Sequence, residues 1–267
     1  MNKRSKPLKS FVFYNGPSAI DGRPVIGVFI RASSNSKTGA GVSQTYILCR
    51  DTDPITANRT GVDVSICGAC VHRGNASPDA TKGNAPGRSC YVNLGQGPLQ
   101  VFKAYHRGNY PAVTHPGEIQ AQINGAFIRM GTYGDPAAIP RQVWAAMLAN
   151  SSGHTGYTHQ QETRTSFADC MQSADTAEQA KQAHSEGFRT FRVIPLQVWK
   201  EHGKTSMLDN EILCPASTEA QQEREAKGIY RGVTCSDCRL CNGTDSTAKS
   251  IAIPAHGAPA RNFKGGL

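Results

Sequence analysis

The chain has 267 residues, with 29 Lys and Arg against 20 Asp and Glu, so its formal net charge is +9. Hydrophobic residues make up 38% of it and charged residues 18%, and its 27 glycines and 15 prolines exclude coiled-coil and fibrous classes and favour a loop-rich globular protein. The apolar stretch Val25–Ile30 is far shorter than the roughly 20 residues that span a bilayer. No apolar signal region follows the basic N-terminus, so we expect a cytoplasmic protein without a transmembrane helix.

Residues 1–60 are expected to form an N-terminal β region behind a basic tail. Within them, the β-like runs PVIGVFI and SQTYIL flank the polar stretch SSNSKTGAG, which predicts a hairpin or a sheet edge. Residues 73–89 contain almost no large apolar side chain and are expected to form a loop. The run GQGPLQ at residues 95–100 begins like a dinucleotide-binding motif but lacks the last glycine, and we expect no long helix after it.

Residues 61–205 are expected to hold a cysteine motif and an α/β core. The apolar run Phe127–Met130 predicts a strand, and the periodicity of PAAIPRQVWAAMLAN predicts a helix with Pro140 in its first turn. After a short strand in HTGYTHQ, a capping box of Thr176 and Gln179 predicts a helix that precedes a strand at Thr190–Ile194. This alternation favours an α/β fold with a mostly parallel sheet or a partial (β/α) barrel.

In such folds the functional side chains lie at the carboxyl ends of the strands. Seven residues fall at or near these ends: Arg129, Gly134, Asp135, Thr158, His159, Asp175 and Arg192. Of these, Arg129, Asp135 and His159 are the candidate catalytic residues, because their side chains can position a cofactor or a substrate. Asp135 has the alternative role of capping the turn that starts at Pro136, and His159 that of an exposed loop histidine.

Nine cysteines indicate metal binding rather than disulfides, because the cytosol keeps thiols reduced and the count is odd. In the expected C-terminal extension, residues 206–267, the run TCSDCRLCNG has the spacing C-x2-C-x2-C and follows a further cysteine in ILCPAS. Four thiolates complete the ligand shell of a 4Fe-4S cluster or of a structural zinc ion. These expected ligands are Cys214, Cys235, Cys238 and Cys241, with His256 as a competing fourth ligand.

A second set of expected metal ligands comprises Cys67, Cys70 and Cys90. Three thiolates leave one iron of a 4Fe-4S cluster open to a ligand or a substrate, which makes such a cluster reactive. His72 offers the alternative of a zinc site with three cysteines and one histidine. Cys49 and Cys170 stand apart from both sets and are expected to be buried core thiols.

The order of the motifs carries a resemblance. A cysteine motif that ends in Cys-Tyr precedes IRMGTYGD, TGYTHQ, CPAS, the C-x2-C-x2-C run and a final Ile-x-Ile-x-x-His. Over about residues 61–256 this order resembles a poorly characterised group of bacteriophage proteins with a layout like that of radical S-adenosylmethionine enzymes. The corresponding pairs are Cys90-Tyr91, Gly134-Asp135 and Tyr157-Thr158. Radical S-adenosylmethionine enzymes usually carry C-x3-C-x2-C in one loop, whereas the spacing here is C-x2-C-x19-C.

The resemblance implies a radical-enzyme-like partial barrel that holds one or two 4Fe-4S clusters and binds S-adenosylmethionine at the open iron of the first. It implies cofactor-binding positions at Tyr91, Gly134, Asp135 and Thr158, an auxiliary role for the C-terminal cluster, and a location in the cytoplasm of the host cell. Together with the positive net charge, it favours a nucleic-acid or nucleotide-related substrate.

Two alternatives stay open. In the first, a non-catalytic protein stabilised by zinc or iron-sulfur clusters binds nucleic acid through its basic surface, using arginines beside the cysteine motifs. Those arginines are Arg73, Arg88, Arg231 and Arg239. In the second, a nucleobase-exchange enzyme on the barrel fold holds zinc through the cysteines of the C-x2-C-x2-C run and His256, a set that is loosely similar to the three-cysteine, one-histidine site of such enzymes.

Overall fold

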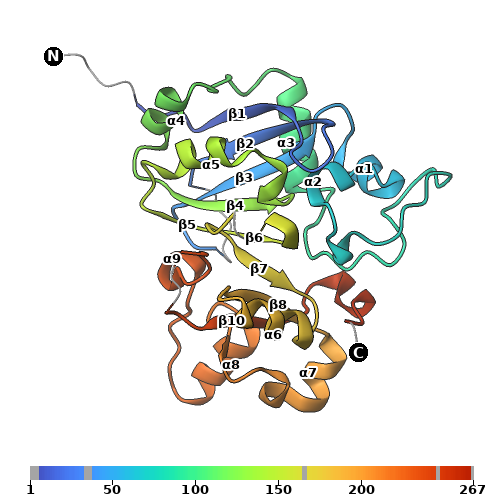
Figure 1. Cartoon of the computed structure of the whole chain (residues 1–267), viewed down its shortest axis with the longest axis vertical. Coiled ribbons are helices and arrows are strands. Elements are labelled where there is room, and N and C mark those ends of the chain that lie inside the picture. Colours follow the sequence, from blue (N-terminus) through green and yellow to red (C-terminus); the bar gives the residue numbers. More distant parts are fainter. Residues whose placement is uncertain (1–5, 33–37, 164–166, 245–246, 266–267) are drawn as a thin grey trace.

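The computed structural model describes residues 6–32, 38–163, 167–244 and 247–265, so part of the expected basic tail lies outside the described ranges (Figure 1). It contains two five-stranded sheets, with the strand orders β1-β2-β3-β4-β5 and β6-β7-β8-β10-β9. In Figure 1 the two sheets follow one another along the long axis of the molecule. None of the helices in the described ranges combines the length and the apolar character that spanning a bilayer requires.

The first sheet is mixed. β1 (Ser10–Pro17), β2 (Pro24–Ile30) and β3 (Val42–Cys49) run antiparallel, whereas β4 (Phe127–Tyr133) and β5 (Gly153–Thr155) extend the sheet in parallel. The predicted hairpin of β2 and β3 is confirmed, although residues 33–37 of its connection lie outside the described ranges. β2 is buried on both faces, which explains its nearly continuous apolar sequence.

Among the described residues of this half of the chain, five segments form helices. They are α1 (Pro54–Thr60), α2 (Val64–Cys67), α3 (Gly97–His106), α4 (Pro116–Ile123) and α5 (Arg141–Leu148). The predicted helix over α5 is confirmed, but Pro140 lies at its N-cap instead of in its first turn. The expectation that no long helix follows GQGPLQ was wrong, because α3 begins within that run and Pro98 occupies its first turn, where a missing N–H is harmless.

The second sheet is entirely parallel. Its strands are β6 (Tyr157–Thr158), β7 (Met171–Ala174), β8 (Thr190–Ile194), β9 (Glu211–Leu213) and β10 (Ser250–Pro254). Its helices are α6 (Ala177–Ser185), α7 (Leu196–His202), α8 (Thr218–Ala226) and α9 (Cys235–Cys238). Short 3-10 turns occur in both halves of the chain. They are η1 (Val71–Arg73), η2 (Pro136–Ala138), η3 (Gln161–Thr163), η4 (Gly203–Ser206) and η5 (Ala258–Asn262). The strand expected at residues 190–194 is confirmed as β8.

The predicted capping box at the start of α6 is half formed. Thr176 Oγ1 accepts the backbone N–H of Gln179 at 3.1 Å. The side chain of Gln179, however, accepts the backbone N–H of Asp175 at 2.8 Å and does not reach that of Thr176. Gln179 thereby holds Asp175, the first residue beyond β7, in a fixed orientation.

Gly156 alone separates β5 from β6 and joins the two sheets. Its N–H donates to the carbonyl oxygen of Cys241 at 2.9 Å, and its own carbonyl accepts the N–H of Met171 at 3.0 Å. A Cβ atom at this position would lie 2.8 Å from the sulfur of Cys170, so a larger residue would push the core apart. The chain is therefore an α/β protein with one mixed and one parallel sheet, connected through a glycine.

The C-terminal turn η5 packs against the loop that precedes Cys90. The Asn262 side chain donates to the carbonyl oxygen of Arg88 at 2.8 Å. The ring of Phe263 lies against that of His72, with their centroids 4.6 Å apart. The last described turn of the chain thus lies beside the first cysteine set.

Candidate functional site

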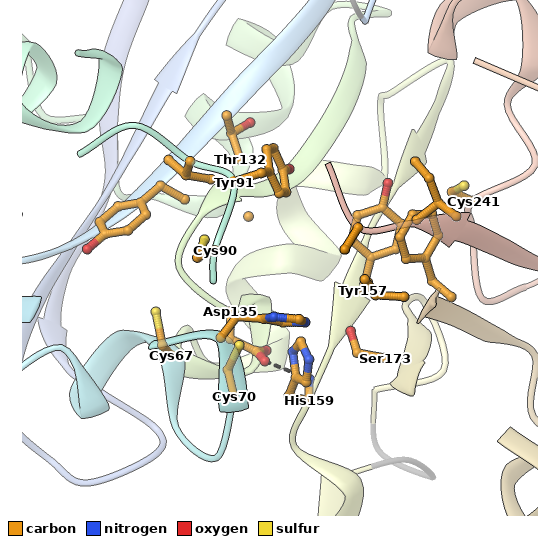
Figure 2. Close-up of a pocket in the computed structure, with 18 of the residues that line it drawn as sticks. Cys67, Cys70, Cys90, Tyr91, Thr132, Asp135, Tyr157, His159, Ser173 and Cys241 are labelled. Carbon is orange, nitrogen blue, oxygen red and sulfur yellow. Dashed lines mark hydrogen bonds between the residues drawn. The ribbon is translucent and has the colours of Figure 1, made fainter. Parts of the chain in front are cut away.

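One cavity of about 260 Å³ lies at the carboxyl ends of β4, β6, β7, β8 and β10. Both cysteine sets border it, and Figure 2 shows Cys67, Cys70 and Cys90 on one side and Cys241 on the other. Six of the seven expected ligands line the cavity, namely Cys67, Cys70, Cys90, Cys214, Cys235 and Cys241. The structure therefore brings together two motifs that stand far apart in the sequence.

The long loop between Cys70 and Cys90 folds back onto the start of its own segment. The backbone N–H groups of Ser89 and Cys90 both donate to the carbonyl oxygen of His72, at 3.1 and 3.0 Å. Arg88, which is only 7% exposed, donates to the carbonyl oxygens of Cys90 and Val92, both at 2.7 Å. These bonds return Cys90 to the other two cysteines of its set.

Arg73 stabilises the other end of the same loop. It forms an ion pair with the buried Asp63 at 2.6 Å and donates to the carbonyl oxygens of Gly61 and Gly68. Gly68, between the first two cysteines, has a φ of +51° and leaves no space for a Cβ, which would lie 2.2 Å from Gln160 Oε1. Arg73 and Arg88 thus both stabilise the cysteine loop, a role that the sequence reasoning did not assign to them.

All nine cysteines are free thiols. Burial raises the pKa of Cys67, and the negative charges of Asp63, Cys70 and Cys90 raise it further. Burial also raises the pKa of Cys90, against a smaller opposing effect of Arg88. The buried thiols of Cys67 and Cys90 would gain from a bound cation, which supplies a positive charge beside the ionised sulfur.

The second set gathers around α9. Cys235 and Cys238 stand at the two ends of this turn, which a capping box between Thr234 and Asp237 secures. Burial raises the pKa of Cys241, followed by the charges of Cys214, Cys238 and Cys235, so all four members interact. Burial likewise raises the pKa of Cys214 to about 11.

Arg189 holds the loop after α9 in place. It is 7% exposed and donates to the carbonyl oxygens of Leu240 and Asn242, both at 2.9 Å, and to that of Lys249 at 2.7 Å. The sequence reasoning missed this residue, because an arginine that precedes a strand carries no local signal of a role in a distant loop.

Asp135 connects the ends of two strands. Its Oδ1 accepts the N–H of Ala137 at 2.9 Å and caps η2, while its Oδ2 accepts the backbone N–H of His159 at 2.8 Å. Gln160, which is 3% exposed, donates to the same oxygen at 3.1 Å and to the carbonyl of Cys67 at 3.2 Å. Asp135 and Gln160 therefore fix the first cysteine turn to the strand ends.

Arg129 points into the cavity between the cysteine sets. Its guanidinium donates to the hydroxyl of Tyr91, and among the described residues no carboxylate lies within ion-pair distance of it. Burial disfavours its charge, but Tyr91, Tyr157, Cys235 and Cys241 outweigh this effect, so the pKa of Arg129 is raised. Arg129 is thus a half-buried cation that lines the cavity.

The other expected positions are distributed as follows. Tyr91 and Gly134 line the cavity, whereas Thr158 is fully buried and its hydroxyl accepts the N–H of Gln160 at 3.1 Å. Arg192 lies away from the cavity in a buried ion pair with Glu211 at 2.6 Å. The expectation that Cys49 and Cys170 are core thiols is confirmed, since both belong to the hydrophobic core of the first sheet.

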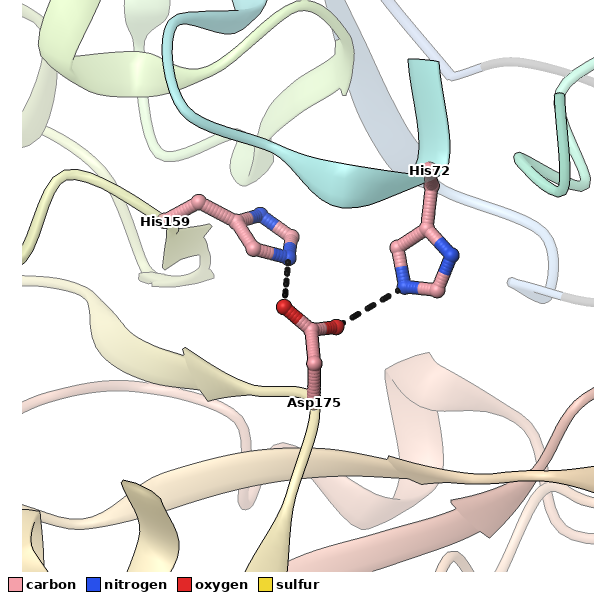
Figure 3. Close-up of side chains that lie close together, drawn as sticks. All are labelled: His72, His159 and Asp175. Atoms are coloured by element: carbon pink, nitrogen blue, oxygen red, sulfur yellow. Dashed lines mark ion pairs between the residues drawn. The ribbon is translucent and has the colours of Figure 1, made fainter. Parts of the chain in front are cut away.

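His72, His159 and Asp175 form a compact group on the cavity wall (Figure 3). Asp175 Oδ1 lies 3.1 Å from His72 Nε2, and Asp175 Oδ2 lies 3.5 Å from His159 Nε2. Burial lowers the pKa of His159, but Cys70 and Asp175 reverse this and raise it overall. Burial raises the pKa of Asp175, whereas both histidines lower it more strongly.

Comparisons with known proteins add no identity. No family model matches the sequence, no curated protein matches it, and no solved structure matches the fold.

Proposed function

We propose that this chain is an iron-sulfur protein that acts as a radical S-adenosylmethionine-like enzyme. The observation that carries the proposal is that two separate sets of free thiols line one cavity at the carboxyl ends of parallel strands. Cys67, Cys70 and Cys90 would hold a 4Fe-4S cluster with an open iron, and the four cysteines around α9 would hold an auxiliary one. With this function, we interpret the two joined sheets as a partial (β/α) barrel.

The dense C-x2-C-x2-C run of the second set favours a cluster over a single zinc ion, because such runs are typical of iron-sulfur proteins. Among the described residues, the one group with all ligand atoms within 4.8 Å of one another is His72, His159 and Asp175, so neither cysteine set meets this limit.

The proposed reaction uses the cavity to keep a reactive species from water. Cys67, Cys70 and Cys90 would hold the first cluster, which, with an external one-electron donor, would supply the reductive cleavage of S-adenosylmethionine and hydrogen-atom abstraction from the substrate. Arg129 would bind an anionic group, such as a carboxylate or a phosphate, because it lines the cavity and no carboxylate of the described residues lies within ion-pair distance of it. Tyr91 orients its guanidinium.

A nucleic-acid or nucleotide-related substrate agrees with the net charge of +9. The non-catalytic nucleic-acid-binding alternative has one specific support, an exposed stretch around α8 and α9 in which Tyr230 is 79% exposed beside Lys227 and Arg231. Arg73 and Arg88, which it also invoked, bond to carboxylate or backbone groups within the chain. We therefore place this alternative second.

The nucleobase-exchange alternative requires Cys235, Cys238, Cys241 and His256 around one zinc ion. His256 instead packs its ring against Tyr91, with centroids 5.2 Å apart, and its Nδ1 lies 3.3 Å from the carbonyl oxygen of Pro254. These four residues do not meet the 4.8 Å limit either. This alternative therefore ranks third.

Anaerobic purification followed by iron, sulfide and zinc analysis tests the proposal. We expect about eight irons and a matching amount of sulfide per chain, with absorption near 400 nm and cleavage of S-adenosylmethionine on reduction. About four irons would leave one cysteine set for zinc. Zinc alone, without sulfide, would refute the radical mechanism and favour the nucleic-acid-binding alternative.

A further inference from the structure

The group of His72, His159 and Asp175 draws its members from three separate elements. His72 lies in η1, His159 directly follows β6, and Asp175 directly follows β7. Figure 3 shows the carboxylate between the two imidazoles, with one oxygen facing each ring. None of the three residues belongs to either cysteine set, so the inference that follows is independent of the proposed function.

The facing atoms of this group are buried but poorly satisfied. His72 Nε2, His159 Nε2 and Asp175 Oδ1 are shielded from solvent and make no hydrogen bond of acceptable geometry. The side chain of Asp175 is 9% exposed and that of His72 is 12% exposed. Buried polar atoms that converge without hydrogen bonds are the arrangement that a bound cation would complete.

Neighbouring groups orient the three side chains from outside. His72 Nδ1 lies 2.8 Å from Ser89 Oγ, which leaves Nε2 to face Asp175. Asp135 holds the backbone of His159, and Gln179 holds that of Asp175, both at 2.8 Å. Histidine ligands of metals usually bond through their second ring nitrogen to an oxygen in this manner, which fixes the ring and its tautomer.

The chemistry of the donors selects the ion. Two neutral imidazoles and one carboxylate suit Zn²⁺ or Fe²⁺, whereas Mg²⁺ and Ca²⁺ prefer oxygen ligands. Three protein ligands leave coordination positions free, and all three residues line the cavity described above. Those free positions would therefore be accessible to water or to an oxygen atom of a molecule in the cavity.

We propose that His72, His159 and Asp175 form a mononuclear site for a divalent transition-metal ion, open toward the cavity. The bound ion lies beside the first cysteine set, since Cys70 and His159 line the same cavity. The cavity then contains a Lewis-acidic ion in addition to any iron-sulfur cluster.

Cobalt(II) is the probe for this site. The full chain is purified in the presence of a reductant and a chelator, and the chelator is removed before Co²⁺ is added. We expect one equivalent of Co²⁺ to bind with the weak visible absorption of nitrogen and oxygen ligands. Thiolate ligands would add an intense near-ultraviolet band, which separates this site from the cysteines. In Asp175→Asn and in His72→Ala, the affinity of this site for Co²⁺ should fall about tenfold or more.

His154→Ala is the matched control, because the ring of His154 bonds to the carbonyl oxygen of Asp169 at 2.8 Å and takes no part in the group. Its Co²⁺ affinity should equal that of the parent chain. Asp175→Asn preserves shape, so it keeps the test decisive if His72→Ala does not fold, as checked by circular dichroism. Unchanged Co²⁺ affinity in Asp175→Asn, or binding with a thiolate spectrum only, would overturn the proposal. Iron and sulfide analysis of the same variant reports separately on the clusters.

Discussion

Cys90 donates its backbone N–H to the carbonyl oxygen of His72 at 3.0 Å. This bond closes the loop between Cys70 and Cys90, so the third thiol returns to the first two in spite of its distance along the chain. Arg88 secures the closure from the other side through its two bonds to carbonyl oxygens. The geometry of the first cysteine set therefore depends on a backbone carbonyl group and an arginine that lie outside the set.

Replacing Arg88 should consequently weaken both the fold and the first metal site. Arg88→Ala leaves two carbonyl oxygens without donors in a buried region, so we expect the free energy of unfolding to fall by about 2 kcal/mol. Urea denaturation measures this loss, and iron analysis should show depletion of the first set. Arg231→Ala is the control, because Arg231 is exposed and should change neither quantity. Equal stability of the two variants would show that Arg88 is dispensable for the loop.

The two cysteine sets should respond differently to the loss of one ligand. Cys238→Ala should lower both metal content and stability, because formation of a structural site contributes to folding. Cys90→Ala should abolish cleavage of S-adenosylmethionine with a smaller loss of stability, if the first set carries the reactive cluster. Metal analysis, thermal denaturation and an activity assay distinguish the two effects. Cys49→Ala, in a core thiol away from both sets, should retain all of the metal. Full metal content in both ligand variants would show that the ligands are assigned wrongly.

Arg129 should determine the affinity of the cavity for anions. Arg129→Met keeps an apolar side chain of similar length but removes the charge, so the affinity for the carboxylate-bearing S-adenosylmethionine should fall about tenfold to a hundredfold. Equilibrium dialysis measures this, with Arg141→Met as an exposed control that should bind normally. If the affinity holds while iron in the second set declines, Arg129 serves the neighbouring cysteines and not the ligand.

The buried thiol of Cys49 predicts a pH effect on stability. Burial, followed by the charges of Asp63 and Asp21, raises the pKa of Cys49 to about 12. Between its unfolded pKa, near 9, and this value, the unfolded chain has lost the proton that the folded chain still holds. Stability is therefore present below about pH 9 and falls by about 1.4 kcal/mol per pH unit as the pH rises toward 12.

Urea denaturation of the parent chain and of Cys49→Ala at a series of pH values isolates this contribution. The variant is expected to be less stable at neutral pH but to show a shallower decline above pH 9, because it lacks the titrating thiol. Parallel curves for the two proteins would contradict the prediction, since they would show that Cys49 ionises equally in the folded and the unfolded chain.

Local signals in the sequence were sufficient for part of the fold. Burial shapes the local sequence of three elements that were predicted correctly. The strands β2 and β8 have apolar runs, and α5 has an amphipathic pattern, so each can be recognised from its own residues. α3 was missed because the run GQGPLQ at its start was compared only with a dinucleotide-binding motif, whose last glycine it lacks. The separation of β5 from β6 was also missed, since it depends on the hydrogen bond from the N–H of Gly156 to the carbonyl oxygen of Cys241, far along the chain.

The candidate site shows the same division. Spacing alone indicated which cysteines belong together, because ligands of one site are often close in sequence. The shared cavity could not be predicted, since it depends on how two sheets meet. His72, His159 and Asp175 had been considered only singly, as an alternative zinc ligand and as strand-end residues. Their association results from the pairing of β6 with β7 and from the return of the loop to η1.

The hydrogen bond from Asn262 to the carbonyl of Arg88 has a consequence for biosynthesis. A ribosome makes the loop that carries Cys90 long before it makes the turn that holds this loop in position. β10, which also borders the cavity, is likewise translated well after that loop. The cavity therefore takes its final form only once residues 250–262 have been made, so the loop that carries Cys90 emerges from the ribosome before its packing partners exist.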